Sequence, residues 1–385
     1  MSGSCRSSSP SLVDPLHIYE DGARSDGLLS SFGAPTPFSP TLQSLPFEMA
    51  PPALTETETA TARDGQVAQL LRAAESNHTK PLWLQMSRLN PPLPNPKCTP
   101  FLWKYADIRP TLIGAGNLVG EKQAERRVLM LVNPSRDAPF TTDTIYAGLQ
   151  LVMPNETAPA HRHTAFAMRF IIEGQGGFTA VQGQRIKMQR GDVILTPTWN
   201  WHDHGKDGSG PMIWLDGLDL PNFVHFPVHF VEHHSAPRYP AEDVDTSQSP
   251  IVFPWTRMKA ALDANKGLDY ASLPYLHADG SEVSKILGGS AAILMPGKKS
   301  PRVQETASSV YHVVEGSGHS LIGGQKFAWQ KGDTFCIPSW YPYEHFADAG
   351  TEPVYLYRFD DKPMLKALGF YRNAEMDVES LVSKY

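Results

Sequence analysis

The chain has 385 residues, of which 41% are hydrophobic and 10% aromatic, so it can fill two hydrophobic cores or one large one. Its 34 basic and 40 acidic residues give a formal net charge of -6. This balance provides neither the basic surface of a nucleic-acid-binding protein nor a long acidic tail, so we expect no nucleic-acid partner.

The three cysteines stand apart in the sequence, without the CxxC spacing of a disulfide framework or a cysteine zinc site. There is no run of about 18 apolar residues, and the N-terminal region has no apolar signal segment. We therefore expect a cytoplasmic protein that does not bind a membrane. A mitochondrial presequence fits less well, because Glu20, Asp21 and Asp26 come early and arginines are sparse.

The N-terminal part of the chain divides by composition. Segment 1–62 is rich in serine, threonine and proline without sustained periodicity, which predicts a disordered tail. Residues 64–77 place their apolar side chains on one helical face after Asp64, which can cap the helix. The repeated prolines of 81–110 predict an extended stretch laid over a core. We treat 63–110 as a helical and extended N-terminal segment.

From about residue 128 the pattern changes to short apolar or alternating runs separated by glycine, proline or aspartate, which is typical of β-strands. A first domain is predicted over 111–232 and a second over 284–375, with a connector at 233–283 and a short tail at 376–385. The number and spacing of the runs predict sandwiches or barrels.

The two strand-rich regions are copies of one unit. The matching turn residues are EGQG at 173–176 with EGSG at 315–318, Gly191-Asp192 with Gly332-Asp333, Pro197 with Pro338, and Trp199 with Trp340. Chance rarely matches so many turn residues in order. Duplication of an all-β unit predicts two tandem jelly-roll barrels with short helical segments near the N-terminus. In this pattern the chain resembles the cupin superfamily.

Three histidines of the first copy have metal-ligand spacing. His161 and His163 precede one predicted strand, and His202 follows the GD turn and the strand VILTP. Alternate residues of a strand point to the same side, so a His-x-His pair can direct two imidazoles into a barrel mouth, where a third joins from an adjacent strand. His204 could equally supply the third nitrogen on composition alone. We interpret His161, His163 and His202 as ligands of one metal ion.

The second copy lacks these ligands. The aligned pairs are His161 with Val303, His163 with Glu305, and His202 with Tyr343. Glu305, His312 and His345 could in principle form another site, but we expect a metal-free structural domain and one metal ion per chain.

The donor set indicates which metal fits. The residues after His163 read TAFAM and offer no carboxylate, so the ligands are three neutral imidazoles. Such a site leaves about three positions open, which suits Fe(II) with a chelating substrate and O₂, whereas zinc cannot supply electrons to oxygen.

Arg169 lies at the start of an apolar strand. It needs an anionic partner if it is buried, or it faces solvent if it is not. Asp216 could orient an imidazole or arginine, or simply belong to a turn.

Longer stretches carry a family resemblance. They are PFLWKYADIRPTLIGAGNLV, AERRVLMLVNP, YAGLQLVMPNETAPAHRHTAFAMRFIIEG, GDVILTPTWNWHDHG and WLDGLDLP. Over most of 80–375 the chain resembles the gentisate 1,2-dioxygenase family of ring-cleaving bicupins, which includes salicylate and 1-hydroxy-2-naphthoate dioxygenases. The resemblance implies that His161, His163 and His202 hold one Fe(II) per subunit, and that gentisate and O₂ give maleylpyruvate.

The resemblance also implies roles for other side chains. Catalytic roles fall on Arg169, His204 and Asp216, and substrate binding falls on Gln150, Arg169 and one arginine of AERR. Spacing does not show which of Arg126 and Arg127 faces the substrate. We predict that Arg127 is the substrate-binding arginine. Family resemblance further implies a homotetramer.

Other functions stay open at this point. The substrate could instead be salicylate, 1-hydroxy-2-naphthoate or an aminophenolic acid. A non-catalytic bicupin binding protein would not need three histidines and a buried arginine. An oxalate-type decarboxylase is disfavoured, because bicupins of that type are expected to have an additional glutamate as a metal ligand. This chain lacks such a glutamate.

Overall fold

The computed structural model describes residues 56–246 and 249–375, so the expected tails at 1–55 and 376–385 lie outside the described residues. The chain divides into two compact units, residues 1–81 and residues 82–385. In the described ranges, no helix has both the length and the apolar content needed to cross a membrane.

The first unit contains the helix α1 (Glu56–Ser76), which covers the helix predicted over 64–77. It begins earlier than expected, and residues 56–62 are helical although we assigned them to the disordered tail. This segment of the tail contains neither proline nor glycine, and threonine lowers helix propensity by only a few tenths of a kcal/mol. Composition alone therefore extended the predicted tail too far.

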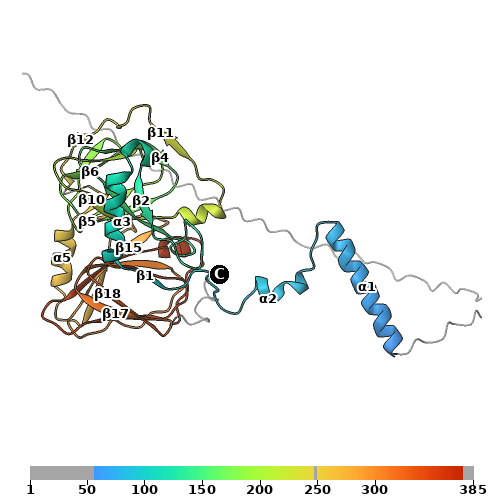
Figure 1. The fold of residues 1–385 in the computed structure, drawn as a ribbon. Coiled ribbons are helices and arrows are strands. Elements are labelled where there is room, and N and C mark those ends of the chain that lie inside the picture. Colours follow the sequence, from blue (N-terminus) through green and yellow to red (C-terminus); the bar gives the residue numbers. More distant parts are fainter. Residues whose placement is uncertain (1–55, 247–248, 376–385) are drawn as a thin grey trace, which may run out of the picture. The chain divides into compact units, whose positions relative to one another are not determined.

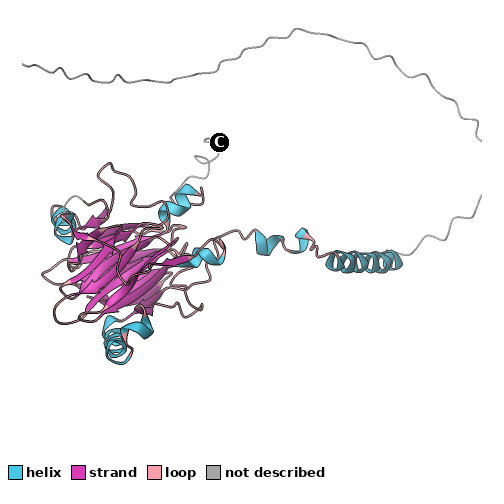
Figure 2. Cartoon of the chain, turned by 90° about the horizontal axis from the view of Figure 1, so that it is seen from above, coloured by secondary structure: helices cyan, strands magenta, loops and turns pink. Residues whose placement is uncertain are grey.

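The second unit is built from four antiparallel-dominated sheets that form two barrels, as the duplication predicted (Figure 1). Figure 2 shows the strands of this unit stacked together with its helices at the periphery. The helical elements of this unit are η1 (Leu82–Leu84), α2 (Met86–Leu89), α3 (Tyr105–Leu118), α4 (Glu121–Ala124), η2 (Leu220–Val224), α5 (Trp255–Asp263) and α6 (Lys362–Ala367).

The first barrel has two six-stranded sheets, ordered β13-β8-β5-β10-β3-β2 and β11-β4-β9-β6-β7-β12. Their strands are β2 (Arg127–Met130), β3 (Tyr146–Val152), β4 (Thr157–His163), β5 (Ala167–Glu173), β6 (Gly177–Val181), β7 (Gln184–Lys187), β8 (Val193–Thr196), β9 (His202–Lys206), β10 (Met212–Leu218), β11 (Val231–His233), β12 (Glu242–Asp243) and β13 (Val252–Phe253).

The second barrel combines a six-stranded sheet, β1-β19-β16-β21-β15-β14, with the three-stranded sheet β18-β17-β20. Their strands are β1 (Phe101–Trp103), β14 (Tyr270–Pro274), β15 (Gly288–Leu294), β16 (Ser309–Glu315), β17 (Ser317–Ile322), β18 (Gln325–Gln330), β19 (Thr334–Ile337), β20 (Tyr343–Ala347) and β21 (Val354–Asp360).

The segments outside the two predicted domains are more regular than we expected. The connector 233–283 is not a free link, since β12 and β13 extend the first barrel and β14 extends the second. The N-terminal segment 63–110 contributes β1, which pairs with β19 of the second barrel and appears in Figure 1 beside the later strands. The strands β1, β12 and β13 have only two or three residues each and leave almost no periodic signal, so sequence patterns could not place them.

The stretch 81–110 is also not simply extended, because α3 begins at Tyr105 and contains Pro110. A proline inside a helix removes one backbone hydrogen bond. The fully buried Leu112 anchors the same helix against the strands, so packing outweighs that loss.

Local geometry shows the duplication in detail. Trp199 and Trp340 share an unusual left-handed backbone, with φ of 64° and 66°. The Trp199 amide donates to the carbonyl of His163 at 2.8 Å, and the Trp340 amide donates to the carbonyl of Glu305 at 2.7 Å. The alignment of His163 with Glu305 made from the sequence is therefore confirmed.

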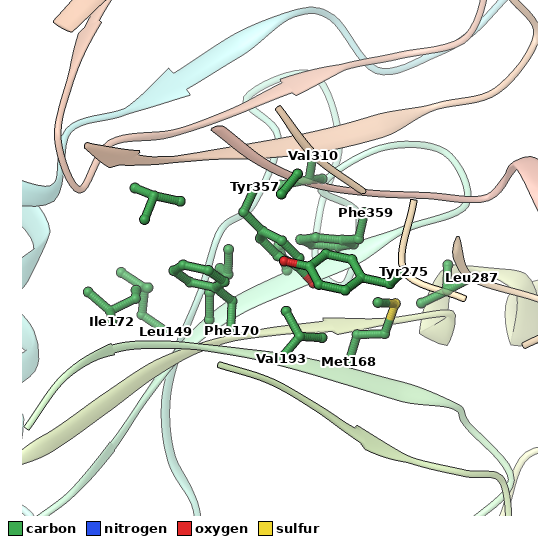
Figure 3. Close-up of a cluster of buried hydrophobic side chains, with 14 of the residues drawn as sticks. Leu149, Met168, Phe170, Ile172, Val193, Tyr275, Leu287, Val310, Tyr357 and Phe359 are labelled. Carbon is green, nitrogen blue, oxygen red and sulfur yellow. The ribbon is translucent and has the colours of Figure 1, made fainter. Parts of the chain in front are cut away.

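A single hydrophobic core joins the two barrels (Figure 3). Phe170 of β5 stacks on Tyr357 of β21 with ring centroids 4.6 Å apart, and both rings are buried. A Cβ atom at Gly217 would collide with the ring of Phe359, so close contact between the sheets requires a glycine there. The barrels are therefore held to each other by packed side chains and not only by the chain linking them.

We predict that Phe170→Ala lowers the free energy of unfolding by about 3–5 kcal/mol, because it empties a fully packed position between the sheets. Urea denaturation followed by tryptophan fluorescence measures the change. Phe370→Ala is the control, since that ring is 62% exposed and its loss should change the free energy by less than about 0.5 kcal/mol. Equal effects of the two substitutions would contradict a shared core.

Candidate active site

Three histidines converge in the mouth of the first barrel. His161 and His163 lie at the end of β4, and His202 begins β9, which pairs with β4 so that His161 stands opposite His202. One ring nitrogen from each lies within 4.8 Å of the others, and all three residues are buried. In the described part of the chain this is the one cluster of histidine, cysteine, aspartate or glutamate able to share an ion.

Backbone carbonyls fix the orientation of each ring. The Nδ1 atoms of His161, His163 and His202 lie 2.8, 2.9 and 2.9 Å from the carbonyl oxygens of Pro159, Ala165 and Asn200, respectively. A carbonyl can only accept a hydrogen bond, so each Nδ1 carries the proton and each Nε2 keeps a lone pair. The Nε2 atom of His202 is buried without a partner among the described residues. This arrangement fits a metal ion bound by three Nε2 atoms.

Burial keeps these rings uncharged. It lowers the pKa of His161 to about 3 and that of His163 to about 4, and the pKa of His202 lies well below its usual value. The guanidinium groups of Arg126 and Arg169 act in the same direction. The lone pairs are thus available to a metal at neutral pH, because no proton competes for them.

The histidines open into a cavity of about 200 Å³. The other side chains that line it are Arg126, Val128, Tyr146, Gln150, Arg169, His204, Asp216, Leu218 and Leu220. The structure therefore brings together Gln150, Arg169, His204 and Asp216, the residues to which the sequence assigned substrate and catalytic roles.

Arg169 faces the interior, and its anionic partner within the chain is Asp216. The two residues stand opposite each other on β5 and β10, with Nε and Oδ1 3.1 Å apart. Arg169 Nη1 also donates to the hydroxyl of Thr196. Burial raises the pKa of Asp216 to about 6, although the neighbouring Arg169 opposes that rise. Asp216 therefore serves as a positioning residue for the guanidinium.

His204 lies beside the metal cluster but is not part of it. Its ring centroid is 5.8 Å from that of His202 and 5.2 Å from that of Trp214. Its Nδ1 atom is buried without a hydrogen-bond partner in the described structure. Of the two alternatives for the third ligand, the geometry favours His202.

Comparisons with known proteins add to this geometry. A family model described as "Cupin domain" matches residues 148–218. The chain is 37% identical to gentisate 1,2 dioxygenase 1 of Aquipseudomonas alcaligenes, covering 78% of this chain and 94% of that protein. The chain belongs to the gentisate 1,2-dioxygenase family. It is therefore a ring-cleaving dioxygenase, an oxidoreductase that acts on an aromatic acid with O₂.

Other relatives of this dioxygenase differ in their named substrates. A 5-aminosalicylate 1,2-dioxygenase of Comamonas sp is 33% identical, with 76% of this chain and 86% of that protein covered. The crystal structure of salicylate 1,2-dioxygenase from Pseudoaminobacter salicylatoxidans, in adducts with gentisate, matches with a TM-score of 0.74 and 32% identity. That match covers 80% of this chain and 93% of the salicylate enzyme. The histidine triad gives this dioxygenase its metal site.

The selection of Arg127 as a substrate-binding residue of the dioxygenase is not supported by its position. Arg127 is absent from the lining of the metal pocket and instead binds Glu156 through two hydrogen bonds of 2.7 and 2.9 Å. Arg126 and Val128 line the pocket, because alternate residues along a strand face the same side. The choice between the two arginines needed the register of β2, which the motif AERR does not contain.

Sequence reasoning missed Tyr146 and the apolar wall of the pocket. Tyr146 and Gln150 lie on the same face of β3, four residues apart, so strand parity applied to YAGLQ could have found Tyr146. Leu220 belongs to η2, which follows β10, and no periodic signal places it in the pocket lining.

We predict that His202→Ala abolishes metal retention, whereas His204→Ala retains the metal and mainly slows turnover, because of these two residues only His202 belongs to the cluster. Metal content after gel filtration, measured by inductively coupled plasma mass spectrometry, tests this. The two variants are matched, since both remove a buried imidazole from β9. Equal loss of metal in both would refute the ligand assignment.

Proposed function

We propose that this chain is an Fe(II)-dependent gentisate 1,2-dioxygenase that opens the ring of gentisate with O₂ to give maleylpyruvate. The observation that carries the proposal is the convergence of three neutral imidazoles in one pocket that the guanidinium groups of Arg126 and Arg169 also line. Relatives named gentisate dioxygenases are 32–37% identical to the chain, which supports this substrate. Fe(II) would supply the redox chemistry that couples the aromatic acid to O₂.

The charge of the pocket suits an anionic substrate. Its lining contains two guanidinium groups, Arg126 and Arg169, but one carboxylate, Asp216. The histidines are neutral, so the protein contributes a net positive charge even before a divalent ion is counted. In a water-poor cavity such a charge binds a carboxylate more strongly than it would in solution.

Arg126 has a position suited to respond to the metal. Its Nη1 atom lies 2.8 Å from Nε2 of His161, the nitrogen whose lone pair a metal would use. One lone pair cannot serve both partners. Binding of iron would therefore release the Arg126 guanidinium, which lies close enough to the cluster to receive the substrate carboxylate.

Neutral side chains can complete the recognition of the substrate. Gln150 has a buried Nε2 donor without a partner among the described residues, and His204 has an unpaired Nδ1. These atoms can bind the carboxylate and hydroxyl oxygens of gentisate, and Asp216 holds Arg169 in place for the same purpose. Val128, Leu218 and Leu220 cover the pocket and limit the entry of water.

A salicylate 1,2-dioxygenase is the second candidate, because the solved structures that match the chain with TM-scores of 0.71–0.74 carry that name.

We further propose that the protein is a cytoplasmic homotetramer. Free Cys98 and Cys336 fit a reducing compartment. Exposed apolar side chains at Val224, Phe226 and Val228 offer a surface for association.

A substrate panel tests the proposed activity. Protein loaded with Fe(II) without oxygen is mixed with gentisate, salicylate or 1-hydroxy-2-naphthoate, and the absorbance of the ring-opened product is followed after O₂ is added. We expect the highest kcat/KM with gentisate. A higher value with salicylate would transfer the assignment to the second candidate, and no product from any of the three would reject the proposed function.

We predict that Arg126→Ala raises KM for gentisate about tenfold or more, because a charge-assisted hydrogen bond contributes about 1.5–3 kcal/mol. The matched substitution Arg127→Ala should mainly lower the thermal midpoint, since it leaves the half-buried Glu156 without its cation. Steady-state kinetics and thermal unfolding of both variants separate the roles. The reverse pattern would return the substrate-binding role to Arg127.

A further inference from the structure

The second barrel contains a cavity of about 600 Å³ at the place that corresponds to the metal pocket of the first barrel. Strand register gives the correspondence, because Tyr311 stands opposite Arg358 as Arg169 stands opposite Asp216, and Val303 pairs with Tyr343 as His161 pairs with His202. The metal ligands are thus replaced by Val303, Glu305 and Tyr343. The cavity has a size typical of small-molecule sites, about 300–1,000 Å³.

One side chain of this cavity has a buried donor with no partner. His345 occupies the position of His204 and is 1% exposed. Its Nδ1 atom lies 2.7 Å from the hydroxyl of Ser320, which already accepts a hydrogen bond from Trp329 Nε1 at 2.9 Å. Ser320 is fully buried, and His345 Nδ1 is the acceptor within reach of its own proton. The serine therefore donates to Nδ1, and the proton of the imidazole lies on Nε2.

His345 lines the cavity, and its Nε2–H group is buried without an acceptor among the described residues. Burial lowers the pKa of His345 to about 3, so the ring is neutral: Nε2 carries its one proton and Nδ1 carries none. A buried donor without an acceptor costs about 1–3 kcal/mol. Such a cost is recovered when a bound molecule supplies an oxygen.

Tyr343 provides a second donor beside the first. The Tyr311 hydroxyl donates to the Tyr343 hydroxyl at 3.3 Å, and in the described structure the Tyr343 proton has no acceptor of its own. The rings of Tyr311 and Tyr343 lie 4.7 and 5.3 Å from that of His345, measured between centroids. Two side chains that line a cavity with aromatic walls therefore each have a donor without an acceptor, which suits a planar ring that carries a carboxylate.

The charged groups around the cavity are paired with one another. Glu305 accepts hydrogen bonds from Arg358, Lys362 and Tyr371, and Arg358 also pairs with Asp360. These two cations and two carboxylates balance each other. Arg302 and Glu375 also line the cavity, and both are exposed. Their opposite charges offset each other, so an anionic ligand here depends on hydrogen-bond donors and not on a net charge.

We propose that the second barrel binds a small aromatic carboxylic acid as a ligand that does not react. Its carboxylate accepts hydrogen bonds from His345 Nε2 and the Tyr343 hydroxyl, and its ring lies against Tyr311 and Tyr343. This site is additional to the proposed active site. The replaced metal ligands leave it no means of cleaving the ring.

Isothermal titration of the full-length, iron-loaded protein with salicylate under anaerobic conditions tests the proposal. Two sites per chain are expected. Tyr343→Phe keeps the ring and removes the donor, so it should weaken the second site at least about tenfold while turnover of gentisate stays unchanged. His345→Asn is an independent variant, because its side-chain oxygen can still accept from Ser320 but no group replaces Nε2–H.

Tyr341→Phe is the matched control, since this tyrosine lies two residues before Tyr343, ahead of β20, and outside the lining of the cavity, so it should titrate like the unchanged protein. One site in the unchanged protein, or two sites that neither variant weakens, would overturn the proposal, and so would equal weakening by Tyr341→Phe. If the proposed function is wrong, the result is different. Gentisate is then not turned over, but a second binding site that Tyr343→Phe weakens is still present.

Discussion

The structure of the active pocket depends on keeping three imidazoles uncharged while they point at one place. Burial under the mouth of the first barrel lowers the pKa of His161, His163 and His202, and backbone carbonyls hold the proton of each ring on Nδ1. Both effects come from the strands themselves. A change of one residue in the register of β4 would turn His161 and His163 out of the pocket, so the pairing of β4 with β9 determines the chemistry.

Much of this arrangement was predictable from the sequence. The spacing of His161 and His163 fixes their common direction once a strand is assumed, and the matched turns around Trp199 and Trp340 show that the strands are repeated. Alternation and turn chemistry are local properties. They therefore predict both barrels, the triad, and the inward position of Arg169 as one of two alternatives.

Other features depend on contacts between distant segments. The presence of Arg126 instead of Arg127 in the pocket lining follows from the register of β2 against β3, which no residue of AERR encodes. The strands β12, β13 and β14 are ordered by the sheets they join, so their own residues give little sign of them. Helix α3 likewise tolerates Pro110 because Leu112 packs against the core. Tertiary packing overrides local preference in each case.

The two barrels also show how one scaffold can keep a pocket while its metal ligands change. At corresponding positions the first barrel has the pair Arg169 and Asp216, and the second has Tyr311 and Arg358. Substitution of His163 by Glu305 replaces a neutral lone-pair donor with an anion that captures Arg358 and Lys362. The shape of the mouth is kept because the backbone hydrogen bonds at Trp199 and Trp340 are the same. A pocket can therefore persist after its metal ligands are lost, since the sheets that form it are required by the shared core between the barrels.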